Sequence, residues 1–94
     1  MMELEVGNFV VSTAGHDLGN YYVIINKDDE YIYLVDGKIK RINRPKKKKR
    51  KHIRKINYVD PSLTELIKNS TVRDEEIKRS IKLRLNGDSG KEVE

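Results

Sequence analysis

The feature that most constrains this chain is the segment Lys38–Lys55, which contains twelve lysine and arginine residues and no acid. Residues 1–36 carry seven acids and one base, and residues 60–94 carry eight acids and seven bases. Twelve like charges repel one another and disfavour compact folding unless a counter-charge is present. Lysine and arginine side chains bind phosphate groups, so this segment, hereafter the basic block, favours a polyanionic partner.

The composition indicates one small domain. A chain of 94 residues, 36% of them hydrophobic, builds a modest core and little more. Cysteine is absent, which leaves no disulfide and no thiolate metal site, as is typical of a reducing cytosol. The first residues are acidic where a secretory signal would be basic, and no apolar run approaches the roughly 18 residues of a membrane span. We therefore expect a soluble, cytoplasmic protein that does not enter a membrane.

The first half of the chain is rich in residues that favour β-strands. Three such stretches occur at residues 3–14, 20–26 and 30–35, each bounded by turn residues. The pair Asp36-Gly37 predicts a two-residue hairpin, since a type I′ turn needs positive φ at both positions. A fourth strand is then expected at 38–42. Pro45 and the lysine run are expected to interrupt regular structure before a fifth strand within 52–59.

From Asp60 onward the pattern becomes helical. Ser62 and Glu65 form a capping-box pattern for a short helix, and Thr71 is the predicted start of a second one. An apolar stripe at spacing four, made of Ile77, Ile81 and Leu85, marks one face of that second helix. Gly87 is the predicted stop. The expected organisation is a β domain over 1–59, a helical appendage over 60–86 and a disordered tail over 87–94.

The stretch from Glu5 to Ile25 resembles the KOW motif, in which a strand leads through a glycine-bounded loop into a second strand. Gly15, Gly19, Tyr22 and Ile24 match its spacing. Together with Tyr31–Lys38 and the basic segment Pro45–His52, it looks closest to bacterial KOW-domain RNA-binding proteins. These are related to a large-subunit ribosomal protein of archaea and eukaryotes. The resemblance covers roughly residues 3–58 and implies a small SH3-like barrel of about five strands that binds RNA.

Expected RNA contacts fall in the glycine-bounded loop and in the basic block. They are Gly15, His16, Gly19, Asn20, Lys38, Lys40, Arg41, Arg44, Lys46, Lys47, Lys48, Lys49, Arg50, Lys51, His52, Arg54 and Lys55. Phosphate contacts give affinity with little base discrimination, which favours structured RNA. We expect a non-catalytic protein that binds ribosomal RNA or the ribosome in translation, with the second helix as a surface for a ribosomal protein partner.

Several alternatives remain open at this stage. The loop glycines serve turn geometry alone or also admit a phosphate, and the tyrosines pack in the core or stack on bases. A small barrel that recruits an acidic protein to the transcription or translation machinery fits the same charge pattern. Catalysis is not expected. Asp28, Asp29 and Glu30 form a turn-like acidic cluster, and Ser12, His16 and Asp17 lack the geometry of a triad. Neither a cofactor loop nor a metal site is expected.

Overall fold

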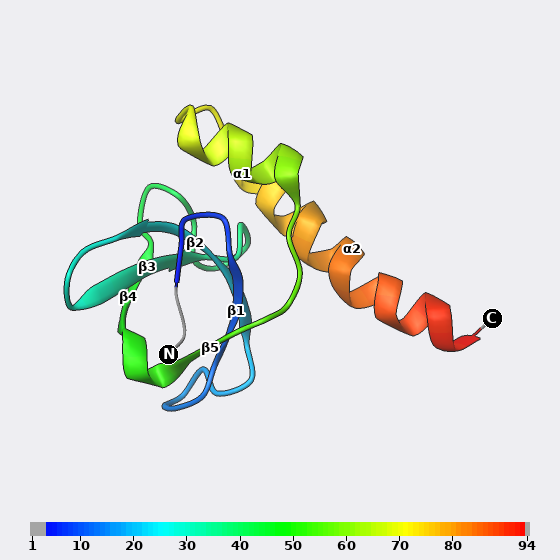
Figure 1. Cartoon of the computed structure of the whole chain (residues 1–94), viewed down its shortest axis with the longest axis horizontal. Helices are drawn as coiled ribbons and strands as arrows, with labels where there is room; N and C mark the ends of the chain where they lie inside the picture. Colours follow the sequence, from blue (N-terminus) through cyan, green and yellow to red (C-terminus); the bar gives the residue numbers. More distant parts are fainter. Residues whose placement is uncertain (1–3, 94) are drawn as a thin grey trace.

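The computed structural model describes the backbone of residues 4–93 and the side chains of residues 4–85. Its strands are β1 (Phe9–Ser12), β2 (Tyr21–Lys27), β3 (Tyr31–Val35), β4 (Lys46–Lys49) and β5 (Ile53–Lys55). Its helices are the 3₁₀ turn η1 (Arg50–His52), α1 (Pro61–Lys68) and α2 (Asp74–Val93). Figure 1 shows the sheet as one body, with α1 and α2 lying along one side of it.

The five strands form one antiparallel sheet in the order β4-β3-β2-β1-β5. The sheet is open, since no ladder among the described strands joins β4 to β5. These two edge strands are nevertheless connected by the three residues of η1, so the sheet curls until its edges approach at that end (Figure 1). The expectation of a mainly β chain with a helical C-terminal part is confirmed.

Both faces of the sheet carry a cluster of buried side chains. One face carries the sheet cluster, made of Leu4, Val10, Tyr22, Ile24, Ile32, Leu34 and Ile53. The other face meets the helices in the helix-facing cluster, made of Phe9, Val23, Val35, Leu63, Ile67 and Ile77. Adjacent strand residues such as Val23 and Ile24 point to opposite faces and are both fully buried. This explains why the hydrophobic alternation of these strands is weak.

The strand predicted at residues 38–42 is wrong. Asp36 does not open a two-residue hairpin; its side-chain Oδ1 accepts hydrogen bonds from the backbone N–H groups of Lys38, Ile39 and Lys40 at 2.8–3.0 Å. This Asx-type geometry turns the chain into a loop. The fourth strand is instead the lysine run itself, Lys46–Lys49, which pairs with β3.

The ends of both helices differ from prediction. The N-cap of α1 is Asp60, whose side chain accepts a hydrogen bond from Leu63 N–H at 3.1 Å, with Pro61 at the first helical position. Helix α2 begins at Asp74 rather than at Thr71 and continues through Gly87, so the predicted stop there is wrong. The expected disordered tail over 87–94 falls in a part of the chain whose side chains lie outside the described residues.

Helix α2 is docked on the sheet at its N-terminal half. Ile77 is 0% exposed, Ile81 is partly buried and Leu85 is 38% exposed, so the apolar stripe opens progressively toward solvent. The Ser80 hydroxyl donates a 2.6 Å hydrogen bond to the Asp60 carboxylate, which ties α2 to the start of α1. In Figure 1 the helix begins beside the sheet and continues past it.

Candidate nucleic-acid interface

The glycine-bounded loop between β1 and β2 is a compact turn. Gly15 and Gly19 have φ of 86° and 89°, a region that L side chains rarely adopt. Within the turn, Leu18 N–H donates to the Gly15 carbonyl at 3.2 Å. A Cβ at Gly19 would have nothing within 4 Å, so this glycine is needed for its backbone angle and not for close packing within the chain. The loop therefore presents open backbone at Gly19.

Asp17 anchors this loop to the sheet and to the basic block. Its Oδ1 lies 2.6 Å from Lys48 Nζ and 3.0 Å from the Ser12 hydroxyl, and its Oδ2 accepts a 3.0 Å hydrogen bond from the Tyr22 hydroxyl. Lys48 Nζ also donates to the Ala14 carbonyl at 2.8 Å. The Lys48 side chain is only 9% exposed. Lys48 therefore holds the loop in place and is not a surface cation.

The electrostatics of Asp17 follow from this environment. Burial raises the pKa of a carboxyl group, but the hydrogen bonds from Lys48, Ser12 and Tyr22 favour the ionised form more strongly. The pKa of Asp17 is lowered from its ordinary value of 3.8 to about 2. For Tyr22, burial and the Asp17 charge together raise the pKa of the phenol to about 12. Asp17 is thus an ionised structural anchor at neutral pH.

The lysines of β4 divide into two pairs by strand alternation. Lys46 and Lys48 are partly buried and lean toward Asp17, with Lys46 Nζ 3.9 Å from its Oδ2. Lys47 and Lys49 point the other way and are exposed. Lys47 Nζ lies 4.3 Å above the ring of Tyr31, a cation–π contact that leaves its ammonium at the surface.

The loop over residues 36–45 carries the first basic side chains outward. Gly37 has φ of 76°, and a Cβ there would collide with the backbone of α2 at Asp74 and Lys78. The Asp74 carboxylate accepts a 2.8 Å hydrogen bond from Ile42 N–H. The loop is therefore fixed against the start of α2. Its exposed basic residues are Lys38, Arg41 and Arg44, and Lys40 is partly buried.

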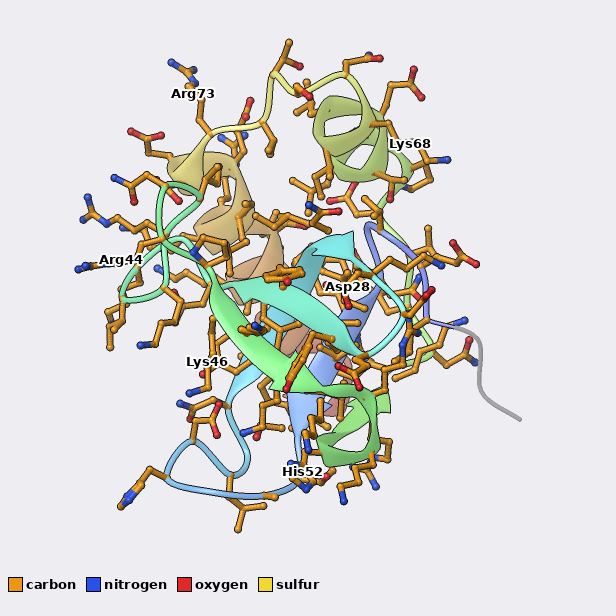
Figure 2. All side chains as sticks on the ribbon, turned by 90° about the vertical axis from the view of Figure 1, so that its left-hand side faces the viewer. Asp28, Arg44, Lys46, His52, Lys68 and Arg73 are labelled. Carbon is orange, nitrogen blue, oxygen red and sulfur yellow. The ribbon has the colours of Figure 1, made fainter. Side chains whose placement is uncertain are left out.

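The basic block continues around one end of the sheet. Figure 2 shows Arg44 and Lys46 on one flank and His52 at the end of the sheet, with Asp28 on the other side of β4. Arg50 in η1 donates to the Asp28 carbonyl, and Lys51 is exposed beside it. Arg54 and Lys55 are exposed on β5, the other edge of the sheet. The predicted contact residues thus follow one path from the α2 side of the 36–45 loop, over β4 and η1, to β5. His16 and Asn20 are exposed in the β1–β2 loop.

The tyrosines separate into packing and surface positions. Tyr22 is buried in the sheet cluster, and Tyr58 packs edge-on against Phe9 with ring centroids 5.0 Å apart. Because Ile32 and Leu34 are fully buried, Tyr31 and Tyr33 are the outward pair of β3, and both are partly exposed. Tyr33 donates a 2.9 Å hydrogen bond to Asp28, which raises the pKa of that phenol.

Sequence reasoning missed the acids that organise this surface. Asp17, Asp36 and Asp74 each position part of the loop or of the basic block through their side chains. Asp36 carried a usable signal, because Asp before Gly is typical of a side-chain-stabilised turn as well as of a hairpin. Asp17 and Asp74 carried none, since their partners Lys48 and Ile42 are 31 and 32 positions away in sequence.

No protein-family model matches the chain, and a search of the curated proteins finds no match. Among the described residues no helix is long and apolar enough to cross a membrane. Nor do His, Asp and Glu side chains gather in groups of three or more that could hold a metal ion, in the part of the chain that the structure describes.

Proposed function

We propose that this chain is a non-catalytic RNA-binding protein whose curled sheet is an SH3-like barrel of the KOW type. Its ligand would be structured RNA, with ribosomal RNA met during translation as the leading candidate, in the cytoplasm. The basic block supplies the phosphate contacts, and the β1–β2 loop at Gly19 offers exposed backbone beside them. The KOW-like spacing of the loop supports this assignment.

One observation carries the proposal. The basic block has twelve cationic side chains, and two of them, Lys46 and Lys48, form ion pairs with Asp17. Lys47, Lys49 and Lys51 remain exposed in succession along β4 and η1. A row of exposed cations held on a strand at fixed spacing suits a phosphate backbone, which repeats its charge at regular intervals.

The acidic residues of the β2–β3 turn limit where RNA can lie on this surface. Asp28 is held by hydrogen bonds from Glu30 N–H and Tyr31 N–H at 2.9 and 2.7 Å, and Asp29 and Glu30 are exposed beside it. Figure 2 shows Asp28 on the side of β4 away from Arg44 and Lys46. Asp28 lies near Lys47 and Arg50, so these carboxylates would repel RNA there and limit how far it extends beyond the lysine row.

The test is the salt dependence of binding to an RNA hairpin and to purified ribosomal RNA. The triple variant Lys47→Gln, Lys49→Gln and Lys51→Gln should bind more weakly and reduce the slope of log affinity against log salt by about 2–3, since each phosphate neutralised contributes about 0.9. The matched control changes three exposed bases outside the block, Lys68, Arg73 and Arg79, to Gln. An unchanged slope in the block variant would remove β4 and η1 from the interface.

Nuclease treatment separates RNA from the rival ligand class, an acidic protein. Partners that co-purify with the full chain from the native host should be lost after RNase digestion. Salt would weaken the binding of RNA and of an acidic protein alike, whereas RNase removes only RNA. Retention of an acidic protein and the absence of bound RNA would overturn the proposal.

A further inference from the structure

A groove separates the C-terminal half of the described part of α2 from the sheet. It has a volume of ≈ 640 Å³ and is formed by three segments that are far apart in sequence. Its lining residues are Gly19, Asn20 and Tyr21 from the β1–β2 side, Asp36, Lys38 and Ile39 from the 36–45 loop, and Lys78, Ile81, Lys82 and Leu85 from α2. The groove opens where the apolar stripe of α2 leaves the sheet.

The apolar side chains at this groove are unusually exposed. Ile39 is 74% exposed and Leu85 is 38% exposed, and Leu18, which precedes the lining residue Gly19, is 65% exposed. Ile81 at the groove wall is partly buried on the helix-facing cluster, so the exposed surface is continuous with the core. Ile39, Ile81 and Leu85 line this one groove, and exposed apolar side chains that gather in this way mark a site of interaction.

The polar lining of the groove is cationic. Lys38 enters from the loop, and Lys78 and Lys82 enter from successive turns of α2. The one carboxylate in the lining, Asp36, has its Oδ1 engaged by three backbone N–H groups of its own loop. The groove therefore combines an apolar floor with a positively charged rim.

We propose that this groove docks a segment of a partner protein that is both apolar and acidic, with leucine-like side chains against Ile39, Ile81 and Leu85 and carboxylates against the lysines. The groove lies beside the exposed row of β4 and η1 and shares Gly19, Asn20 and Lys38 with the proposed RNA interface. The inference rests on the apolar lining and not on RNA binding, so the two are tested separately below. Such a partner would cover the apolar residues and neutralise the lysines in one step.

Charge and side-chain chemistry disfavour the other occupants. A second copy of this chain would bring the lysine rims of two grooves together, which is unfavourable for a symmetric contact. RNA would use the lysines but would leave Ile39 and Leu85 without a partner, because aliphatic side chains offer neither stacking nor hydrogen bonds to bases. An acidic amphipathic segment uses both parts of the groove.

In the test, peptides that bind the full chain are selected from a random displayed library, and the affinity of each selected peptide is measured by fluorescence anisotropy. Selected peptides should combine Asp or Glu with Leu, Ile or Phe. The Ile39→Ser variant should weaken their binding by about tenfold or more, as expected for a central apolar contact. The double variant Lys78→Gln and Lys82→Gln should also weaken peptide binding and should make that binding less dependent on salt.

The matched control is Val59→Ser, because Val59 is similarly exposed and does not line the groove. It should bind the peptides as the parent chain does. Failure to select such peptides, or equal binding by Ile39→Ser, would overturn the proposal. Two other outcomes would also overturn it. If Ile39→Ser lowered the affinity for an RNA hairpin but not for the peptides, the groove would bind RNA; if the parent chain self-associated and Ile39→Ser abolished this, the groove would bind a second copy.

Discussion

Asp17 determines which cations of the basic block belong to the fold and which remain at the surface. Its carboxylate holds Lys48 against the β1–β2 loop, and the hydroxyls of Ser12 and Tyr22 complete its hydrogen bonds. A buried ion pair of this kind is retained when its hydrogen-bonding groups are satisfied, and it is costly to break from one side. One acid therefore makes it possible for β4 to be built from lysines.

The substitution Asp17→Asn should destabilise the chain. It leaves the Lys48 ammonium largely buried without its counter-charge, which costs about 3 kcal/mol of unfolding free energy. Since the pKa of Asp17 is lower in the folded chain than its ordinary 3.8, its ionisation stabilises the fold above that pH, and this stabilisation is lost as the pH falls toward about 2. Urea unfolding at a series of pH values should show a larger loss in the parent chain than in Asp17→Asn, which still carries Asp28, whose pKa is also lowered by its hydrogen bonds.

Glu30→Gln is the matched control, because Glu30 is an exposed acid of the neighbouring β2–β3 turn. It should leave the free energy of unfolding at neutral pH close to that of the parent chain. A parent chain whose stability does not change between pH 3.8 and 2, with Asp17→Asn equally stable, would contradict the anchoring role of Asp17.

At the scale of elements, the strands with apolar side chains were predictable and the charged strand was not. β1, β2 and β3 lie within the stretches 3–14, 20–26 and 30–35, apart from one residue at the end of β2. β4 has no hydrophobic alternation, because Lys46–Lys49 repeats one residue type. Its stability comes from pairing with β3, from the Asp17 anchor and from the cation–π contact of Lys47 with Tyr31. These partners are distant in sequence, and lysine on an edge strand also discourages edge-to-edge association.

The residues of the candidate interface could be predicted from the sequence, but their arrangement in space could not. Charge alone identified the basic block, and spacing alone identified the glycine-bounded loop. Neither indicated that Lys48 joins these two segments from inside, or that the 36–45 loop rests on α2 through Ile42 and Asp74. The groove near Ile39 depends on that docking, so no local pattern could have revealed it.

The contact between the 36–45 loop and α2 predicts a difference between two glycines. Gly37→Ala places a Cβ against the α2 backbone at a positive φ, so it should lower the unfolding free energy by more than about 2 kcal/mol. Gly19→Ala shares the positive φ but meets nothing within 4 Å, and should cost about 1 kcal/mol. Thermal unfolding of both variants measures the difference. Equal costs would show that the loop and α2 are not in close contact.

At the scale of the whole molecule, the helices are part of the core and not an accessory to it. Half of the helix-facing cluster comes from the sheet, through Phe9, Val23 and Val35, and half comes from α1 and α2. The bond between Ser80 and Asp60 fixes the two helices to each other. A small domain has few other apolar residues with which to cover that face.

Truncation after Val59 should therefore prevent stable folding. It removes Leu63, Ile67 and Ile77 and exposes the sheet residues beneath them. Burial of each of these three side chains contributes about 2 kcal/mol, and their sum of about 6 kcal/mol is comparable with the about 5–15 kcal/mol that stabilises a whole domain. Truncation after Leu85 keeps all three residues and should preserve the unfolding transition. Circular dichroism melts of the two truncated chains make the comparison, and a cooperative melt for residues 1–59 at the temperature of the full chain would show that the sheet is stable without its helices. In that event the RNA-hairpin affinity of residues 1–59 should equal that of the full chain, because the basic block lies wholly within them.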